Sequence, residues 1–202
     1  MTDHQPAVAA TRWKTTFLVS FGVFIVLALA ARLWGVLPGE PQLYHWMLGW
    51  TSPGVVTVFW WVNELPSRWI AGPGTLLLLW AVLPARRRWW LWVGVILLAP
   101  IFEDLAKLVV GRLRPEGPAS GFPSGHVTAA AAFFPMAAYL GGKAVMNRRA
   151  RIGLWLVAAA LVLLGGIARI LLRAHWPADV LAGAGLGFAC MAFAAWWNER
   201  SP

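Results

Sequence analysis

Long apolar runs, separated by short polar and basic segments, make up most of the chain. A helix needs about 20 apolar residues to cross a bilayer. Five runs approach that length: Thr16–Trp34, Trp89–Val110, Val127–Leu140 with its flanks, Ile152–Ala168 and Val180–Trp197. A sixth run, Ile70–Leu83, is short and reaches the length only if Pro66–Trp69 lies in the membrane interface. The pattern predicts an all-α integral membrane bundle of six transmembrane helices.

The segment Pro41–Leu65 fits either a seventh span or a helix on the membrane surface. Polar residues, among them His45, Asn63 and Glu64, interrupt its aromatic and branched residues. That mixture favours an interfacial helix between spans one and two. There we expect it to cover the entrance of a site.

The positions of the cations decide between six and seven spans. Cytoplasmic loops of membrane proteins carry an excess of Lys and Arg. With six spans, the N-terminus, the loops at 85–88 and 143–151 and the C-terminus share the cytoplasmic side and hold most of the basic residues. A seventh span would move Arg86, Arg87 and Arg88 to the other side, against that rule.

Composition supports a single membrane domain over residues 1–202. Of these residues, 59% are hydrophobic and 12% are charged, about half the charged share of a soluble domain. The cations behind the net charge of +9 lie between apolar runs and not on a soluble face, so we expect no nucleic acid as a partner. The lone Cys190 allows no internal disulfide and no cysteine metal site. The first apolar run is too long for a signal peptide and is expected to be retained.

Three short polar blocks stand at the ends of apolar runs. They read Lys107…Arg114-Pro115, Pro123-Ser124-Gly125-His126 and Arg169…His175…Asp179. The six-span topology puts all three blocks on the non-cytoplasmic side. Ionisable groups near hydrocarbon are costly, so this gathering of cations and imidazoles indicates a shared site for an anion, and phosphate suits it best.

The second block begins the fourth span. Ser124 is a good helix N-cap, and Gly125 lets a bound group approach the backbone closely. Free N–H groups at a helix start attract anions, and His126 would lie in the first turn beside such an anion. This block alone leaves open an ordinary capped helix with an interfacial histidine.

The third block combines a histidine with a carboxylate. His175 and Asp179 are four residues apart, and Pro177 suits the first turn of span six. A carboxylate at that reach can hold an imidazole in one tautomer and leave its other nitrogen free to attack. The alternative is a solvated interfacial salt bridge.

The first block supplies positive charge. Arg114 can bind phosphate oxygens in a bidentate way, whereas Lys107 acts as a point charge. Arg112 and Arg173 lie nearby and rank lower, since they suit lipid headgroups equally well. Glu103, four residues before Lys107, is interpreted as its intrahelical partner. With few carboxylates in the neighbourhood, we expect no metal site.

Taken together, the blocks resemble the signature of a known family. Lys107-x6-Arg114-Pro115, Pro123-Ser124-Gly125-His126 and Arg169-x5-His175-x3-Asp179 match the three-part motif of the type 2 phosphatidic acid phosphatases, the PAP2 superfamily, in order and in spacing. The resemblance runs from about span three to span six, with its signature at residues 107–179. One departure is Ala168, where many members have serine, and it puts one minor phosphate contact in doubt.

The resemblance implies a role for each matched residue. His175 is similar to the nucleophile that forms a phosphohistidine, Asp179 to its orienter, and His126 to the general acid that protonates the leaving oxygen. The phosphate-binding residues that the resemblance implies are Lys107, Arg114, Ser124, Gly125 and Arg169. It implies neither a metal nor a cofactor. One histidine must begin neutral and the other protonated, so we expect a bell-shaped dependence of rate on pH.

We therefore expect a metal-independent membrane lipid phosphatase that cleaves a phosphate monoester or diphosphate, with undecaprenyl diphosphate as the first candidate. The alternatives are a lipid phosphotransferase, a phosphatase for phosphatidylglycerophosphate, phosphatidate or lipid A, and a small anion transporter. The expected partners are a phosphorylated lipid substrate and membrane lipids, with no obligatory protein partner. The expected location is the bacterial cytoplasmic (inner) membrane, with both termini cytoplasmic and the active site on the periplasmic or extracellular side.

Overall fold

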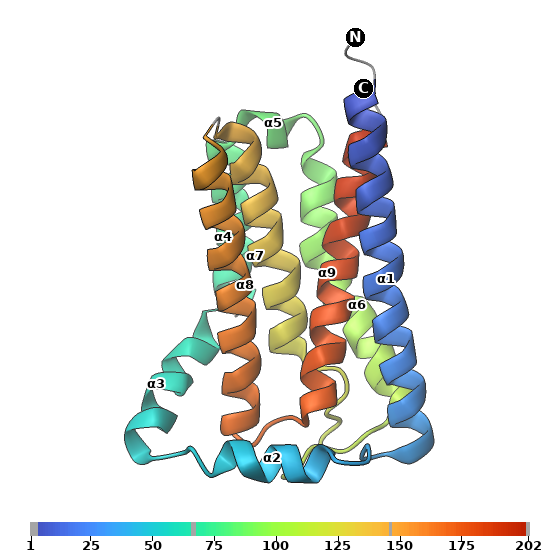
Figure 1. Cartoon of the computed structure of the whole chain (residues 1–202), viewed down its shortest axis with the longest axis vertical. Helices are drawn as coiled ribbons and strands as arrows, with labels where there is room; N and C mark the ends of the chain where they lie inside the picture. Colours follow the sequence, from blue (N-terminus) through green and yellow to red (C-terminus); the bar gives the residue numbers. More distant parts are fainter. Residues whose placement is uncertain (1–3, 66–67, 146, 201–202) are drawn as a thin grey trace.

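The chain folds into a bundle of helices, as the apolar runs predict. A computed structural model describes residues 4–65, 68–145 and 147–200, and these residues contain helices and no strand (Figure 1). An isolated β-bridge joins Leu113 to Ser120. The helices are α1 His4–Trp34, α2 Glu40–Leu48, α3 Pro53–Glu64, α4 Arg68–Ala81, α5 Leu83–Arg86, α6 Trp89–Val110, α7 Gly125–Ala144, α8 Arg148–Leu171 and α9 Pro177–Arg200. The all-α prediction is confirmed.

Each predicted apolar run coincides with a helix. The runs correspond to α1, α4, α6, α7, α8 and α9, and α6 has the predicted bounds, Trp89–Val110. Pro66 and Ser67, which the sequence interpretation puts in the membrane interface, lie outside the described residues. Among the described residues, α1 from Val8 onward, α8 and α9 are long and apolar enough to cross a membrane.

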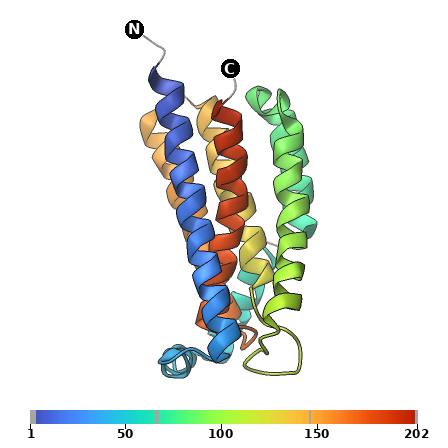
Figure 2. The same ribbon diagram turned by 90° about the vertical axis from the view of Figure 1, so that its right-hand side faces the viewer.

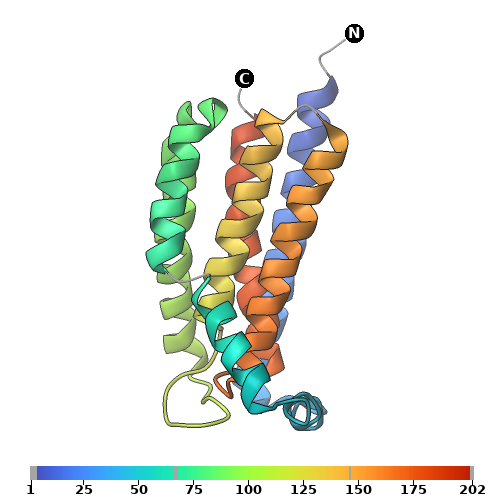
Figure 3. The same cartoon turned by 90° about the vertical axis from the view of Figure 1, so that its left-hand side faces the viewer.

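The segment predicted as one interfacial helix forms two helices, α2 and α3. Ser52 between them has an extended backbone, with φ −127° and ψ 164°, and its side chain accepts a hydrogen bond from the Val55 N–H at 3.4 Å. A residue before proline avoids the helical region, so Pro53 separates the two helices. α2 lies across one end of the bundle, and α3 rises from it beside α8 (Figure 3).

Glycines let α9 approach α7 closely. A Cβ atom added at Gly183 would lie 2.6 Å from the carbonyl oxygen of Ser124, and one added at Gly187 would collide with the carbonyl oxygen of Thr128. Helices come this close only where side chains are absent. The N-terminal ends of α7 and α9 therefore lie side by side, and these ends carry parts of the second and third polar blocks.

The two ends of the bundle differ in their contents. α2, the connection between α6 and α7 and the starts of α7 and α9 lie at one end (Figures 1 and 2). The start of α1, α5 and the end of α9 lie at the other end. The basic segments assigned to the cytoplasm thus share one end, and the polar blocks share the opposite end.

The outer surface is strongly apolar. Leu33, Trp80 and Leu108 are 75%, 72% and 82% exposed, and many other large apolar side chains are exposed with them. Soluble proteins rarely expose contiguous apolar patches larger than a few hundred Å². Together with the three helices that can cross a bilayer, this surface identifies an integral membrane protein.

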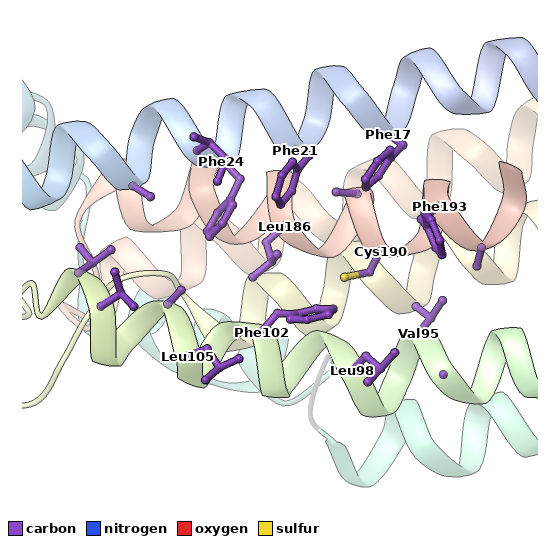
Figure 4. A pocket seen from close by; sticks show the side chains of 18 of the residues that line it. Phe17, Phe21, Phe24, Val95, Leu98, Phe102, Leu105, Leu186, Cys190 and Phe193 are labelled. Atoms are coloured by element: carbon purple, nitrogen blue, oxygen red, sulfur yellow. The ribbon is translucent and has the colours of Figure 1, made fainter. Parts of the chain in front are cut away.

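An apolar groove of about 820 Å³ lies between α1, α6 and α9. Figure 4 shows Phe21 of α1, Phe102 of α6 and Cys190 of α9 directed into it. Arg32, in the last turn of α1, is the charged residue in its lining. None of the predicted catalytic or phosphate-binding residues lines the groove, so it is not the predicted anion site.

Candidate active site

The three polar blocks meet at the end of the bundle where α2 lies. The backbone N–H of Ser124, in the second block, donates to the carbonyl oxygen of Asp179, in the third, at 2.9 Å. Arg112, between the two ends of the first block, donates from Nη1 to Asp179 Oδ1 at 2.7 Å. Segments that are far apart in the sequence therefore share one site.

A tight turn carries His175 from α8 to α9. The N–H groups of Ala174 and His175 both donate to the carbonyl oxygen of Arg169, at 3.0 and 3.2 Å. Pro177 begins α9, as predicted, because its fixed φ suits the first helical turn. The turn holds His175 over the first turn of α9, where Asp179 lies.

Asp179 faces His175 without a direct hydrogen bond. His175 Nδ1 is 3.6 Å from Asp179 Oδ2, beyond the usual hydrogen-bond range. The same oxygen accepts the backbone N–H of Trp176 at 2.9 Å. His175 is 2% exposed and Asp179 is fully buried, which argues against the solvated salt bridge that the sequence left open.

The surroundings of His175 favour its neutral imidazole form. Burial lowers its pKa below the ordinary value of 6.5, and the positive charges of Arg169 and Arg114 act in the same direction. Asp179 acts in the opposite direction without reversing the shift. A neutral imidazole keeps a lone pair on nitrogen, as a nucleophile requires.

Ser124 occupies the N-cap position of α7, but its side chain does not cap the helix. No cap hydrogen bond forms, and the Oγ atom is buried without a protein partner. The carbonyl oxygen of Ser124 instead accepts the Thr128 side chain at 3.0 Å. Buried hydroxyls are nearly always hydrogen-bonded, so this one is available to a group from outside the chain.

Gly125 has a structural reason in addition to the predicted one. A Cβ atom at this position would collide with the carboxylate of Glu103 on α6. The absence of a side chain therefore lets α7 begin against Glu103, and a phosphate contact from the Gly125 backbone stays a prediction. Glu103 also pairs with Lys107, which confirms the intrahelical interpretation of Glu103.

The remaining cations surround His126. Its side chain is half-buried in the first turn of α7, and the charges of Lys107, Arg114, Arg169 and His175 all act on it. Arg169 Nη1 donates to Asn63 Oδ1 of α3 at 2.7 Å, while its Nε is buried without a partner. Every predicted site residue is thus at this end of the bundle.

Comparison with known proteins agrees with the signature. The family model described as the PAP2 superfamily matches residues 116–202, which contain the second and third blocks. Over these residues the chain matches the PAP2 superfamily. Lys107 and Arg114 lie outside the matched range. Their assignment to the site depends on the motif and on their position in the structure.

Two curated relatives and one solved structure resemble this chain. The lipid A 1-phosphatases of Rhizobium johnstonii and Rhizobium etli are each 32% identical over 128 residues, covering 53% of this chain. These alignments cover 46% and 48% of the relatives, so the chain spans about half the length of the curated relatives it matches. A crystal structure of a transmembrane PAP2-type phosphatidylglycerolphosphate phosphatase from Bacillus subtilis has a TM-score of 0.83 and 22% identity, over 93% of this chain and 98% of that one. This likeness shows that the fold is shared.

Glu40 is not among the predicted site residues, and Arg112 has a larger role at the site than its sequence position indicates. Arg112 is 5% exposed and bridges Glu40 and Asp179, so it does not meet lipid headgroups. Glu40 is 6% exposed at the start of α2. The available signal was that both charges stand beside apolar segments, where an ionisable residue usually has a partner.

Arg173 and Glu116 form an exposed ion pair at the same end of the bundle. Their side chains pair at 3.0 Å and are 55% and 57% exposed. An exposed pair of this kind contributes little to stability, so the lower rank of Arg173 suits its position. Within the described ranges, no group of three or more His, Cys, Asp and Glu side chains is arranged to hold a metal ion, and metal independence stays a prediction.

Proposed function

We propose that this PAP2 protein is a lipid phosphatase that hydrolyses a phosphate monoester or diphosphate through a phosphohistidine on His175. The observation that carries the proposal is the surroundings of His175. A buried neutral imidazole has a carboxylate on its Nδ1 side, with an unpartnered serine hydroxyl and several cations nearby. These are the parts that phosphoryl transfer to a side chain requires.

In the first step, His175 Nε2 attacks phosphorus. The new P–N bond forms as the bond from phosphorus to the lipid oxygen breaks, and His126 donates a proton to that oxygen. The phosphohistidine carries positive charge on its ring, which Asp179 stabilises from the Nδ1 side.

In the second step, water attacks phosphorus and the P–N bond breaks. His126, now neutral, takes a proton from the water, and inorganic phosphate leaves. The reaction regenerates neutral His175 and protonated His126, so the chain ends in the state in which it began.

The positive groups stabilise charge on the transferring phosphoryl oxygens. Lys107, Arg114 and Arg169 provide three cations, and Ser124 offers a hydroxyl. The adjacent N-terminal ends of α7 and α9 add the positive ends of two helix dipoles. Preorganised charge of this kind usually contributes most to phosphoryl transfer. The role of Gly125 is to let the α7 start pack against Glu103, which pairs with Lys107.

We also propose the arrangement in the membrane. α1, α4, α6, α7, α8 and α9 cross the bilayer, while α2 and α3 lie at its outer surface over the site. The basic end of the bundle, with both termini, faces the cytoplasm of a bacterial cell. The site then opens on the periplasmic or extracellular side of the inner membrane.

We consider two lipids as the leading candidate substrates of this site. Undecaprenyl diphosphate is the first candidate, because an outward-facing site is where a spent lipid carrier needs dephosphorylation. Lipid A 1-phosphate is the second, because the two Rhizobium relatives are named for it. Both present a phosphate group at the membrane surface, and both suit the same cation cluster.

The test is phosphate release by the purified full-length protein from a panel of lipids. The panel contains undecaprenyl diphosphate, lipid A, phosphatidylglycerophosphate and phosphatidate, each assayed with and without EDTA. We expect release from at least one lipid, no loss on chelation, and loss of turnover in His175→Ala. Transport in vesicles that survives His175→Ala, without lipid hydrolysis, would support an anion transporter instead.

A second arm separates hydrolysis from transfer. Adding an acceptor lipid should leave the yield of free phosphate unchanged if water is the acceptor. A lipid phosphotransferase would instead release little phosphate and would phosphorylate the added lipid.

A further inference from the structure

Glu40 and Arg112 are buried charges that the proposed reaction does not use directly. Their side chains are 4% and 2% exposed. A buried charge is costly unless it is paired and hydrogen-bonded. Arg112 contacts Asp179, the partner of the proposed nucleophile, and Glu40 accepts the N–H of Ala178, the residue before Asp179. Their location suggests a task in the reaction beyond holding the fold together.

We propose that Glu40 and Arg112 are positioning residues that fix Asp179 beside His175 and set the net negative charge that the imidazole faces. This inference rests on the proposed function, because it takes His175 as the nucleophile. Neither residue touches the phosphate. Each acts through Asp179.

Arg112 joins two carboxylates with its two terminal nitrogens. Nη1 donates to Asp179 Oδ1 at 2.7 Å, and Nη2 pairs with Glu40 Oε2. The guanidinium also lies over the Trp176 ring, 5.8 Å from its centroid. The planar fork of arginine fixes the direction of both bonds, so Asp179 is held on its Oδ1 side. Its Oδ2 is held by the Trp176 N–H and is left facing His175.

Glu40 connects α2 to the start of α9. Its Oε1 accepts the N–H of Ala178, the residue before Asp179, at 2.8 Å. Its Oε2 accepts the N–H of Leu37 at 2.9 Å, in addition to the Arg112 pair. The carboxylate of Glu40 therefore ties the segment before α2, the α6–α7 connection and the first turn of α9 to one point.

Charge gives the trio a second effect. Two carboxylates and one guanidinium, from Glu40, Asp179 and Arg112, leave a net charge of −1. The other charged groups that face His175 are Arg169 of α8, Arg114 of the α6–α7 connection and, when protonated, His126 of α7. All of those are positive, so the trio is what balances positive charge on the ring of phosphohistidine.

Two substitutions should move the pH profile in opposite directions. Glu40→Gln removes one negative charge, so the pKa of His175 falls and the acid limb of kcat/KM moves to lower pH. Arg112→Gln removes the positive charge, so the pKa of His175 rises and the limb moves to higher pH. We expect kcat to fall by about 10-fold to 100-fold in each variant, as when the partners that orient metal-bound histidines are removed. Loss of structure alone would lower the amount of active protein without moving the limb.

Conservative variants separate position from charge. Arg112→Lys and Glu40→Asp keep the charges but change the bonds, so kcat should fall while the acid limb stays at its wild-type position. If Arg112→Gln does not fold, Glu40→Gln against Glu40→Asp still tests the charge effect. The matched control is Glu116→Gln, which removes a carboxylate from the exposed ion pair with Arg173 and should change neither kcat nor the limb.

The outcomes distinguish this inference from the proposed function. If wild-type protein releases no phosphate, or His175→Ala keeps turnover, the proposed function fails. A second outcome is that wild type is active and His175→Ala is not, while Glu40→Gln and Arg112→Gln keep the wild-type kcat and the wild-type acid limb of kcat/KM. In that case only this inference is wrong. Limbs that shift in the same direction also contradict it.

Discussion

The residues at the site differ in whether other groups of the protein form hydrogen bonds with their buried polar atoms. Asp179 has partners on both carboxylate oxygens, whereas Ser124 Oγ is buried with none. A buried polar atom without a hydrogen-bond partner lowers the stability of the folded protein. We therefore predict that the Ser124 hydroxyl contributes to ligand binding and not to the stability of the unliganded protein.

Ser124→Ala tests that statement. Because a hydrogen bond to a charged group contributes about 1.5 to 3 kcal/mol, kcat/KM should fall by about 10-fold to 100-fold. The melting temperature should not fall, since no bond within the protein is lost. The control is Thr75→Ala on α4, which removes a buried hydroxyl bonded to the Ala71 carbonyl oxygen, and should leave kcat/KM unchanged. A melting temperature that drops in Ser124→Ala without loss of kcat/KM contradicts the assignment.

The pH dependence belongs to the same scale. His175 attacks only as a neutral imidazole, and its pKa lies below 6.5 because burial and the Arg169 charge disfavour the protonated form. The value of kcat/KM should therefore stay near its maximum as the pH falls through 6.5 and should drop only at lower pH. On the alkaline side, the rate should fall as His126 loses the proton that the negative charge of bound phosphate helps it to keep. The profile of kcat/KM, measured with two lipids of different phosphate pKa, should be bell-shaped with the same acid limb. A flat profile contradicts the pair of histidines.

At the scale of helices, glycines, which have no side chain, determine how closely the helices that carry the site can pack. Gly187 of α9 faces the Thr128 carbonyl oxygen of α7, whereas a Cβ at Gly153 of α8 would meet nothing within 4 Å. Periodicity predicted the helices well, and α6 has its predicted bounds. It did not predict which glycines face a neighbouring backbone, because that depends on how α7 and α9 pack in space.

A pair of glycine substitutions tests the α7–α9 contact. Gly187→Ala should lower the free energy of unfolding by about 1 to 3 kcal/mol, the usual range for overpacking, and should displace Asp179 from the start of α7. Gly153→Ala should leave stability unchanged or raise it by up to about 1 kcal/mol, because alanine favours a helix. Thermal unfolding in detergent measures both. Equal effects at the two positions would show that α7 and α9 do not approach closely.

α3 contributes to the site through Asn63. Its Oδ1 accepts Arg169 Nη1 at 2.7 Å, and both residues are buried. Asn63→Ala should leave the guanidinium without that partner and raise KM for the lipid, with a smaller effect on kcat, because Arg169 binds phosphate in both steps. A steady-state comparison with Asn147→Ala, at the start of α8 and the opposite end of the bundle, provides the control. A change in kcat alone would place Asn63 with the nucleophile instead.

At the scale of the whole molecule, the sequence predicted more of the site than of its supports. Apolar runs and basic loops led to the helices and to the common end of the three blocks, because both follow from the membrane. Lys107, Arg114, His126, Arg169, His175 and Asp179 all lie at that end, as predicted. Glu40 was missed because its partners are 72 and 138 residues away along the chain, and no local pattern carries that information. The split of Pro41–Leu65 into α2 and α3 follows from Pro53, because the residue before a proline avoids the helical backbone conformation.

The most direct test of the central claim is rapid-quench detection of phosphorylated His175. Wild-type protein mixed with a 32P-labelled lipid substrate should acquire an acid-labile, alkali-stable label within the first turnover, located by peptide mapping on His175. His175→Ala should acquire none. His126→Ala should accumulate the label from a substrate with a good leaving group, because water attack then lacks its base. Turnover by the wild type without any labelled protein, or a label on another residue, would contradict the account.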